Sequence, residues 1–319
     1  MLLLALLLFV QLPDEGLASQ GDMSSIYRGC IGRECYSNFD CPASFSDYGW
    51  VRGDCFRCRQ KCVWETVEHF QNEYGFVPQF HGKWPFAAID VNILGLHIVI
   101  QELASFLFSL GNFWTVLMMR EKIASMKHLP NKMMWMYYTS VGLITWLCSA
   151  FFHAQDFWLS ELLDYFSAFA YVIFAFYLSV HITQPFLGER KKVSNLLAVS
   201  LMLFYAYHIS CMWSHFDYGW NMQCCIAFAL LSTGLYVFHL IRRWSRGISS
   251  TSDRLLLFLL LWTNCSIACE LLDFVPLFWL FDAHSLFHLF TIPVPILFVT
   301  FLEAHAANHK SADDITKLL

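Results

Sequence analysis

Charged residues are scarce in this chain: they make up 14% of its 319 residues, whereas 57% are hydrophobic. A soluble domain averages about 25% charged residues. So few charges exclude an ordinary soluble domain and indicate a membrane protein. The net charge is −5, and we expect a membrane and no nucleic acid among the partners.

Internal repeats, low-complexity tracts and long linkers are also missing. After about residue 90 the chain consists of apolar segments, each close to the 20 residues that a membrane-spanning helix needs. We place seven of them near residues 97–119, 133–154, 163–183, 194–213, 220–241, 254–273 and 284–302. The prediction is an all-α membrane protein whose residues 93–303 form seven transmembrane helices.

Lysine and arginine are missing from the second, fourth and sixth connections between these segments. The other connections and the tail contain Arg120, Lys122, Lys127, Lys132, Arg190, Lys191, Lys192, Arg242, Arg243, Arg246, Arg254, Lys310 and Lys317. Basic loops mark the cytoplasmic side of a membrane. We therefore place the C-terminal tail, residues 304–319, in the cytosol, and the even connections and the N-terminus in the lumen.

The N-terminus lacks a basic segment, but an apolar run is followed there by polar residues and small residues near Ala18. This pattern is typical of a secretory signal peptide, which we assign to residues 1–19. The alternative is a first transmembrane helix, for which the run is too short.

Six of the twelve cysteines gather in the polar segment that follows, residues 20–92. They are Cys30, Cys35, Cys41, Cys55, Cys58 and Cys62. An even set behind a signal peptide predicts three disulfides in a small lumenal domain, with 15 pairings possible. The alternative is a zinc knuckle built on Cys55 and Cys58. The other six cysteines are scattered through apolar segments, where cysteine is a small hydrophobe.

A set of ionisable residues lies in the apolar segments, where such groups are costly and mark candidate sites. By the predicted topology, Ser149 and His153 end the second span, Asp164 begins the third, and His284 and His288 begin the seventh. All five residues therefore meet at the lumenal side of the membrane.

The spacing of these residues favours a catalytic zinc site. Positions four apart share a helix face, so His284 and His288 point the same way. With His153 they give three ligands and one open position, the pattern of catalytic zinc. Asp164 would hold the attacking water and take its proton. Ser149 would donate a hydrogen bond to that water or to a developing oxyanion.

Simpler roles stay open for several of these residues. Asp164 alone would also stabilise the start of a helix. Carboxylates near the lumenal boundary are either partners of the histidines or, as we slightly favour, solvated: Asp156, Asp217, Glu270, Asp273 and Asp282. We interpret His97, His181, His208 and His239 as structural. His81 and Lys83 would meet an anionic headgroup or, as we favour, anchor the chain at the interface.

The residues Ser149, His153, Asp164, His284 and His288 resemble the metal-binding set of a superfamily of seven-span hydrolases. It includes alkaline ceramidases, adiponectin and progestin receptors, and Per1-like proteins. Residues 78–86, 216–221, 270–279 and 282–284 are most similar to signature stretches of the Per1-like family. The similarity covers nearly the whole chain after the signal peptide.

The resemblance implies a zinc enzyme that remodels glycosylphosphatidylinositol (GPI) anchors in the Golgi membrane or the endoplasmic reticulum. Such proteins hydrolyse the sn-2 acyl ester of GPI-anchored proteins, a phospholipase A2-type reaction. It also implies that His153, His284 and His288 bind the zinc, with Ser149 and Asp164 beside them. The alternatives are a ceramidase-like lipid amidase and a non-enzymatic receptor or escort for GPI-anchored proteins.

Overall fold

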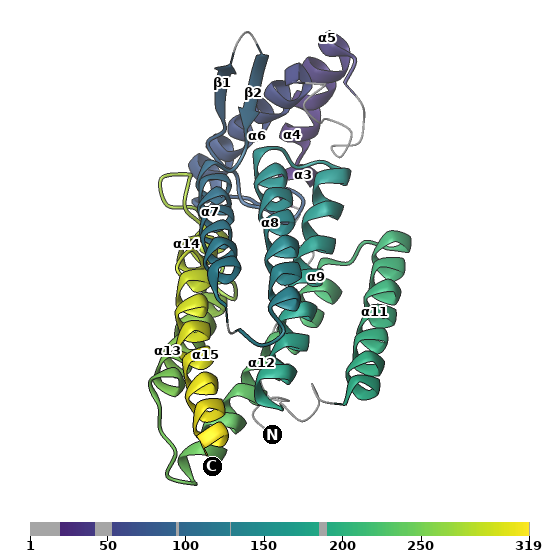
Figure 1. Ribbon diagram of the computed structural model, residues 1–319. Coiled ribbons are helices and arrows are strands. Elements are labelled where there is room, and N and C mark those ends of the chain that lie inside the picture. Colours follow the sequence, from purple (N-terminus) through teal and green to yellow (C-terminus); the bar gives the residue numbers. More distant parts are fainter. Residues whose placement is uncertain (1–19, 42–52, 94–95, 128, 185–189, 319) are drawn as a thin grey trace. The chain divides into compact units, whose positions relative to one another are not determined.

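The computed structural model describes residues 20–41, 53–93, 96–127, 129–184 and 190–318 (Figure 1). The chain forms two compact units, each built from several stretches of sequence. The first unit comprises Met1–Ser109, Cys148–Leu163 and Ala268–Leu289, and the second comprises Leu110–Leu147, Asp164–Ile267 and Phe290–Leu319. The predicted signal peptide, residues 1–19, lies outside the described residues.

The N-terminal part of the first unit is helical. Short helices come first: α3 (Gln20–Met23), α4 (Ser25–Cys30), the π-helix η1 (Ile31–Tyr36) and α5 (Ser37–Phe39). Ser24 caps α4, because its hydroxyl accepts a hydrogen bond from the backbone N–H of Tyr27. The helix α6 (Gly53–Tyr74) follows and is the longest helix of this N-terminal domain.

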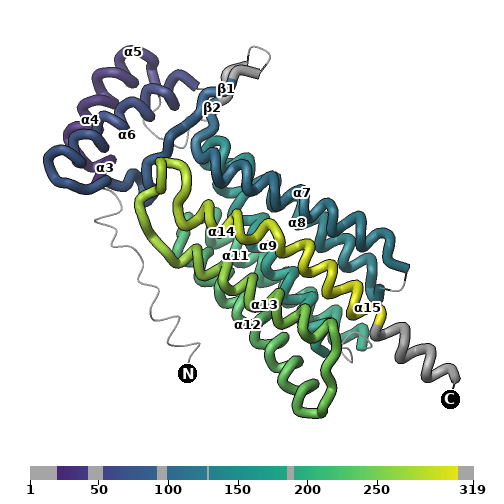
Figure 2. The backbone as a smooth tube through the Cα atoms, turned by 90° about the vertical axis from the view of Figure 1, so that its left-hand side faces the viewer, coloured from purple at the N-terminus to yellow at the C-terminus, as the bar shows by residue number. Residues whose placement is uncertain are grey.

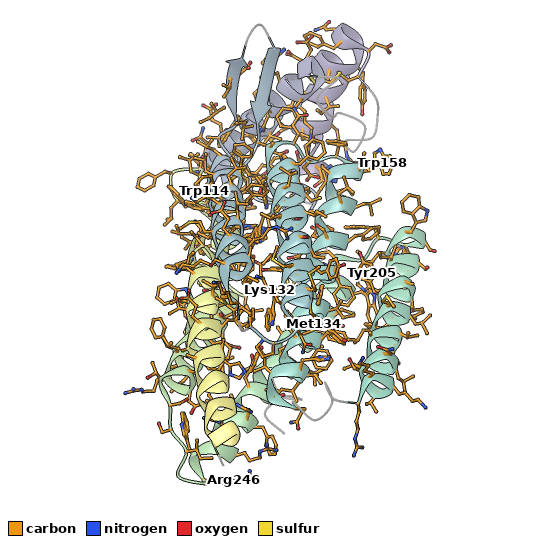
Figure 3. The ribbon with its side chains drawn as sticks, in the orientation of Figure 1. Trp114, Lys132, Met134, Trp158, Tyr205 and Arg246 are labelled. Atoms are coloured by element: carbon orange, nitrogen blue, oxygen red, sulfur yellow. A yellow bond between two sulfur atoms is a disulfide. The ribbon has the colours of Figure 1, made fainter. Side chains whose placement is uncertain are left out.

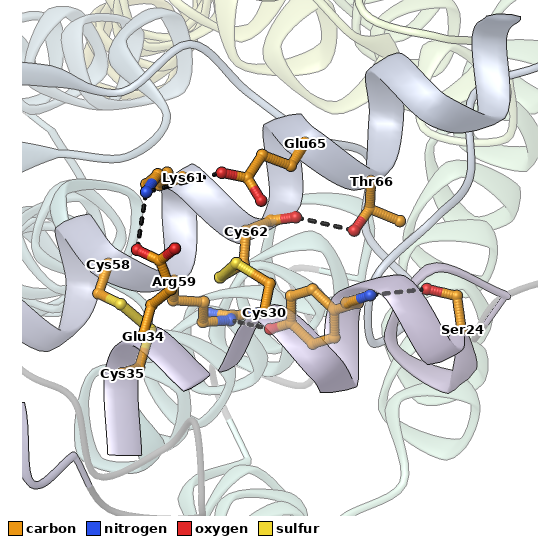
Figure 4. Close-up of a disulfide and its surroundings, with 11 residues drawn as sticks. Ser24, Cys30, Glu34, Cys35, Cys58, Arg59, Lys61, Cys62, Glu65 and Thr66 are labelled. Carbon is orange, nitrogen blue, oxygen red and sulfur yellow. Dashed lines mark hydrogen bonds and ion pairs between the residues drawn. A yellow bond between two sulfur atoms is a disulfide. The ribbon is translucent and has the colours of Figure 1, made fainter. Parts of the chain in front are cut away.

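Three disulfides join the short helices to α6, as predicted. They are Cys30–Cys62, Cys35–Cys58 and Cys41–Cys55, a nested order in which the two segments run antiparallel. Figure 4 shows the first two beside the ion pair of Lys61 with Glu34, whose Nζ and Oε2 are 2.7 Å apart. Because Cys55 and Cys58 bond to different partners, the zinc-knuckle alternative is wrong.

A hairpin connects this domain to the first long apolar helix. Strands β1 (Ile89–Ile93) and β2 (Leu96–Ile100) pair antiparallel, with Ile89 opposite Ile100. The first apolar segment, predicted from residue 97, therefore enters its helix only at Leu103. The preceding residues include Ile98, Val99 and Ile100, whose β-branched side chains favour a strand over a helix.

The long helices cover most of the remaining chain. They are α7 (Leu103–Ser125), α8 (Lys132–Ala154), α9 (Trp158–Thr183), α11 (Lys191–Ser214), α12 (Tyr218–Trp244), α13 (Thr251–Cys269), α14 (Ala283–Thr291) and α15 (Val294–Leu318). Among the described residues six spans are long and apolar enough to cross a membrane. Helix α8 is not among the six, since serine, threonine and tyrosine lower its hydropathy, so a count of seven stays a prediction.

The last apolar segment is two helices rather than one. Helix α14 ends at Thr291, and Pro293 follows, whose ring nitrogen has no N–H to continue the hydrogen-bond ladder. Helix α15 then starts with the Pro293 carbonyl accepting from Leu297 N–H at 3.0 Å. Together they still give one apolar span, Ala283–Ala307.

The second unit has an apolar core and an apolar surface. Its core contains Met119, Trp135, Leu178, Leu240, Leu256 and Phe301 from α7, α8, α9, α12, α13 and α15, which run alongside one another (Figures 1 and 2). Large apolar side chains also face outward: Trp114, labelled in Figure 3, is 62% exposed. Such a surface suits lipid, and the chain is a multi-pass membrane protein.

Candidate metal centre

Two helix ends of the first unit position the histidines. His153 is the penultimate residue of α8, and His284 and His288 lie in the first two turns of α14. Asp282 starts α14: its Oδ1 accepts from Ser285 N–H at 2.8 Å, and Ser285 Oγ accepts from Asp282 N–H at 2.9 Å. This reciprocal cap fixes the turn that carries His284.

The three imidazoles point their Nε2 atoms at one another. His284 Nε2 lies 3.3 Å from His153 Nε2 and 2.8 Å from His288 Nε2. The three ligand atoms all lie within 4.8 Å of one another. The structure therefore brings together the three histidines that the sequence assigned to one site.

Each of two Nδ1 atoms is held by a carboxylate. His153 Nδ1 lies 2.6 Å from Glu102 Oε2, and both side chains are buried. His284 Nδ1 lies 2.8 and 2.9 Å from the two carboxylate oxygens of Glu270. A carboxylate accepts and does not donate, so both rings carry their proton on Nδ1. Their Nε2 lone pairs are left for a metal ion.

The third ring is held by a hydroxyl. Ser109 Oγ donates to the Ser105 carbonyl at 2.7 Å, which uses its only proton. It can then only accept from its other two neighbours, His288 Nδ1 at 3.3 Å and Ser149 Oγ at 3.1 Å. His288 therefore also carries its proton on Nδ1, and all three rings have the same tautomer.

The geometry fits a tetrahedral metal ion. Zinc binds histidine nitrogen at about 2.0–2.1 Å, which puts two nitrogens of one tetrahedral site about 3.3 Å apart. The His153–His284 separation matches this value, and the His284–His288 separation is slightly shorter. Carboxylates behind the ligands, such as Glu102 and Glu270, are usual outer partners of metal-bound histidines.

The charge of the three-histidine site and its exposure also fit a metal ion. Burial raises the pKa of Glu102, but the opposing effect of His153 and Lys83 is larger. The pKa is lowered to about 2, so this carboxyl is ionised. Its negative charge would offset part of the charge of a divalent cation. His284 has 35% of its side chain exposed, whereas His153 has 1%. The site is therefore reached on the His284 side.

Ser149 and Asp164 are the other two predicted site residues. Ser149 is buried and reaches His288 through Ser109. Asp164 is a buried residue in the second turn of α9 and begins the second unit, so its assignment to the site stays a prediction. The six predicted disulfide cysteines are all paired, as described above.

Two residues of the site were missed in the sequence, and one was underrated. Glu102 stands directly before an apolar helix, where an isolated acidic residue is itself a sign of a site. Ser109 gives no such sign, because serine is common in membrane helices. Glu270 was interpreted as slightly more consistent with a solvated residue, yet it holds His284 with both oxygens.

Fold and site together define a multi-pass α-helical membrane protein with a three-histidine cluster and a disulfide-bonded N-terminal domain. The chain belongs to the Per1-like family, whose model matches residues 46–306. No solved structure matches it.

Curated relatives are similar over nearly the whole chain. A Mus musculus protein named GPI-specific phospholipase A2-like PGAP3 is 35% identical over 303 residues, covering 90% of each chain. The Danio rerio protein of the same name is also 35% identical, covering 89% of this chain and 90% of its own. A Drosophila melanogaster protein named post-GPI attachment to proteins factor 3 is 30% identical, covering 93% of this chain and 92% of its own.

Proposed function

We propose that this protein is a zinc-dependent hydrolase that removes the sn-2 acyl chain from the lipid of GPI-anchored proteins. The observation that carries the proposal is the cluster of His153, His284 and His288, with three Nε2 atoms facing one another. Three histidines with a free position are typical of catalytic rather than structural zinc. The names of the relatives supply the lipid class: GPI-specific phospholipase A2-like.

The metal and the chain have separate tasks in this reaction. A zinc ion held by the histidines would lower the pKa of an attacking water to about 7 and polarise the ester carbonyl. Glu102 and Glu270 keep two of the rings in the ligating tautomer. Ser109 does the same for His288 and ties it to Ser149.

Ser149 and Asp164 are proposed to act on the reacting atoms. Ser149 is a buried hydroxyl linked to His288 through Ser109. By turning its proton from Ser109 toward the substrate, it would stabilise the oxyanion that forms on the ester carbonyl. Asp164 is a buried carboxylate that would take the proton of the water. A buried ionisable residue in a membrane helix is costly, which favours a functional role.

The proposed compartment is the lumen of the Golgi apparatus or the endoplasmic reticulum. Three disulfides support an oxidising compartment for the N-terminal domain. The basic connections support a cytosolic C-terminus. GPI-anchored proteins face the lumen, so this orientation puts the histidines on the same side as the substrate.

Purified protein and a defined GPI lipid test the function. The lipid carries different acyl chains at sn-1 and sn-2, and the released fatty acid is identified by mass spectrometry. We expect release of the sn-2 chain by the wild-type protein and none by His284→Ala. His181→Ala, which changes a histidine bonded to Ser194 at 2.9 Å, is the matched control and keeps activity. Release of fatty acid by His284→Ala would refute the zinc mechanism.

A further inference from the structure

The first unit contains a pocket of about 690 Å³ beside the metal centre. Ligand pockets commonly have about 300–1,000 Å³. Its walls come from α3, α4, η1 and α6 of the disulfide domain, from residues 80–86, and from the first turn of α9. Gln101 and Asp156 also line it. The reaction proposed above assigns no task to this pocket.

The pocket is continuous with the metal-binding segments. Gln101 N–H donates to the Ala154 carbonyl at 2.9 Å, and the next residue, Glu102, donates to the His153 carbonyl at 3.0 Å. Lys83 Nζ lies 4.3 Å from the centroid of the Phe152 ring, which is adjacent to His153. A ligand in the pocket would therefore lie next to the cluster without occupying it.

A strained turn shapes one wall. Phe80 and Lys83 exchange both backbone hydrogen bonds, at 2.8 and 3.0 Å, around His81 and Gly82. Both central residues have positive φ, 50° for His81 and 74° for Gly82, as a two-residue hairpin turn requires. This conformation costs a histidine energy, and such strain gathers at functional sites. The turn carries His81 and Lys83 into the pocket lining.

The lining combines charges of both signs. The cations are Arg28, Arg59 and Lys83, and the carboxylates are Asp22, Asp156 and Glu161. Arg59 is buried, with its Nε donating to the Tyr27 hydroxyl at 2.9 Å, and Lys83 pairs with Asp156. Arginine matches the geometry of phosphate oxygens. The carboxylates accept from hydroxyl and amino groups, and they disfavour a ligand that is only anionic.

Aromatic rings also line the pocket, among them Tyr36, Trp84 and Trp158. Tyrosine and tryptophan combine an apolar face with a polar edge. Sugar rings match this surface, because their faces carry C–H groups and their edges carry hydroxyls. Phosphate, hydroxyl and amino groups on sugar rings are therefore the chemistry that fits the whole lining.

We propose that this pocket binds the phosphate-bearing sugar headgroup of the substrate, the inositol phosphate–glucosamine part of a GPI lipid. The assignment rests on the proposed function for the identity of the lipid. The pocket would hold the headgroup while the acyl ester lies at the histidines, so lipids without the sugar would bind weakly.

Binding of the headgroup alone tests the site without any hydrolysis. The probe is chain-free inositol phosphate–glucosamine, titrated calorimetrically into the full-length protein in detergent. The pocket variants are Arg28→Gln and Trp158→Ala, and the matched controls are Arg33→Gln and Trp114→Ala, whose side chains do not line the pocket. Trp158 is 47% exposed, so its loss leaves the fold intact, which thermal unfolding checks (Figure 3).

We expect both pocket variants to raise the Kd at least 10-fold and both controls to leave it within 2-fold. His284→Ala should bind the probe as the wild type does. If the wild-type protein binds the probe but does not hydrolyse the GPI lipid, the proposed function is overturned and the pocket assignment stands. The pocket assignment is overturned if the wild type does not bind the probe, if the pocket variants bind it unchanged, or if inorganic phosphate competes equally well.

Discussion

Glu270 binds His284 Nδ1 with both of its carboxylate oxygens, at 2.8 and 2.9 Å. Glu270 directly follows α13, which ends at Cys269, and His284 lies in the first turn of α14. This contact sets the tautomer and the orientation of the most exposed of the three histidines.

Glu270→Gln should therefore weaken zinc binding by about 10–100-fold, the usual effect of removing an outer partner of a ligand. The amide keeps the shape but donates as well as accepts, so the ring is no longer held in one tautomer. Zinc affinity is measured by competition with a chelating dye. Asp273→Asn is the control, since Asp273 accepts from Trp84 Nε1 instead. Equal affinities for both variants would contradict the role of Glu270.

Ser109→Ala should weaken zinc binding more than Ser149→Ala does. The first change leaves the buried His288 Nδ1–H without its acceptor, at a cost of about 1–3 kcal/mol. The second removes a hydroxyl that contacts Ser109. If Ser149 stabilises the oxyanion, its loss lowers kcat with zinc content unchanged. The reverse order of zinc affinities would show that Ser109 does not orient His288.

The histidine cluster could be predicted from the sequence because two simple periodicities determine it. The four-residue spacing of His284 and His288 puts both on one helix face, and the alternation of basic loops puts His153 at the same membrane side. The residues that hold the histidine rings in place could not be predicted equally well. Ser109 is one serine among several in apolar helices, and only the packing of α7 against the helix ends selects it.

The fold was predicted in outline, with errors where local propensity competes with hydrophobicity. The first span was predicted to begin near residue 97, but residues 96–100 pair as strand β2. The disulfide pairing had an unused indication: Cys55, Cys58 and Cys62 are three and four residues apart, a stripe on one helix face. A helical α6 then pairs with its partners in reverse order when the first segment runs antiparallel to it, as the structure has them.

Removing the Cys41–Cys55 disulfide with a double serine variant should destabilise the first unit by about 3 kcal/mol in the chain-entropy account. The Cys30–Cys62 bridge spans 32 residues against 14 but should cost a similar amount, because the bridges nested inside it already shorten the loop that it closes. Thermal unfolding of purified protein measures both. Cys265→Ser changes an exposed thiol and should shift the midpoint little. Midpoints equal to that control would contradict a stabilising role for the bridges.

Asp164→Asn should lower kcat by about 100–10,000-fold, the range for losing a general base. The zinc content should stay that of the wild type, because Asp164 is not assigned as a ligand. Fatty-acid release and bound zinc are measured on the same preparation. Asp217→Asn is the control: Asp217 caps α12 through Trp220 N–H, and asparagine caps equally well. An active Asp164→Asn protein would show that Asp164 is not the general base.

The central claim is that His153, His284 and His288 hold a metal ion on which ester hydrolysis depends. The most direct measurement is fatty-acid release from a defined GPI lipid by purified protein, before and after dialysis against a chelator. We predict that activity is lost with the metal and returns when one equivalent of zinc is added back. Full activity in protein shown by elemental analysis to be metal-free would contradict the account.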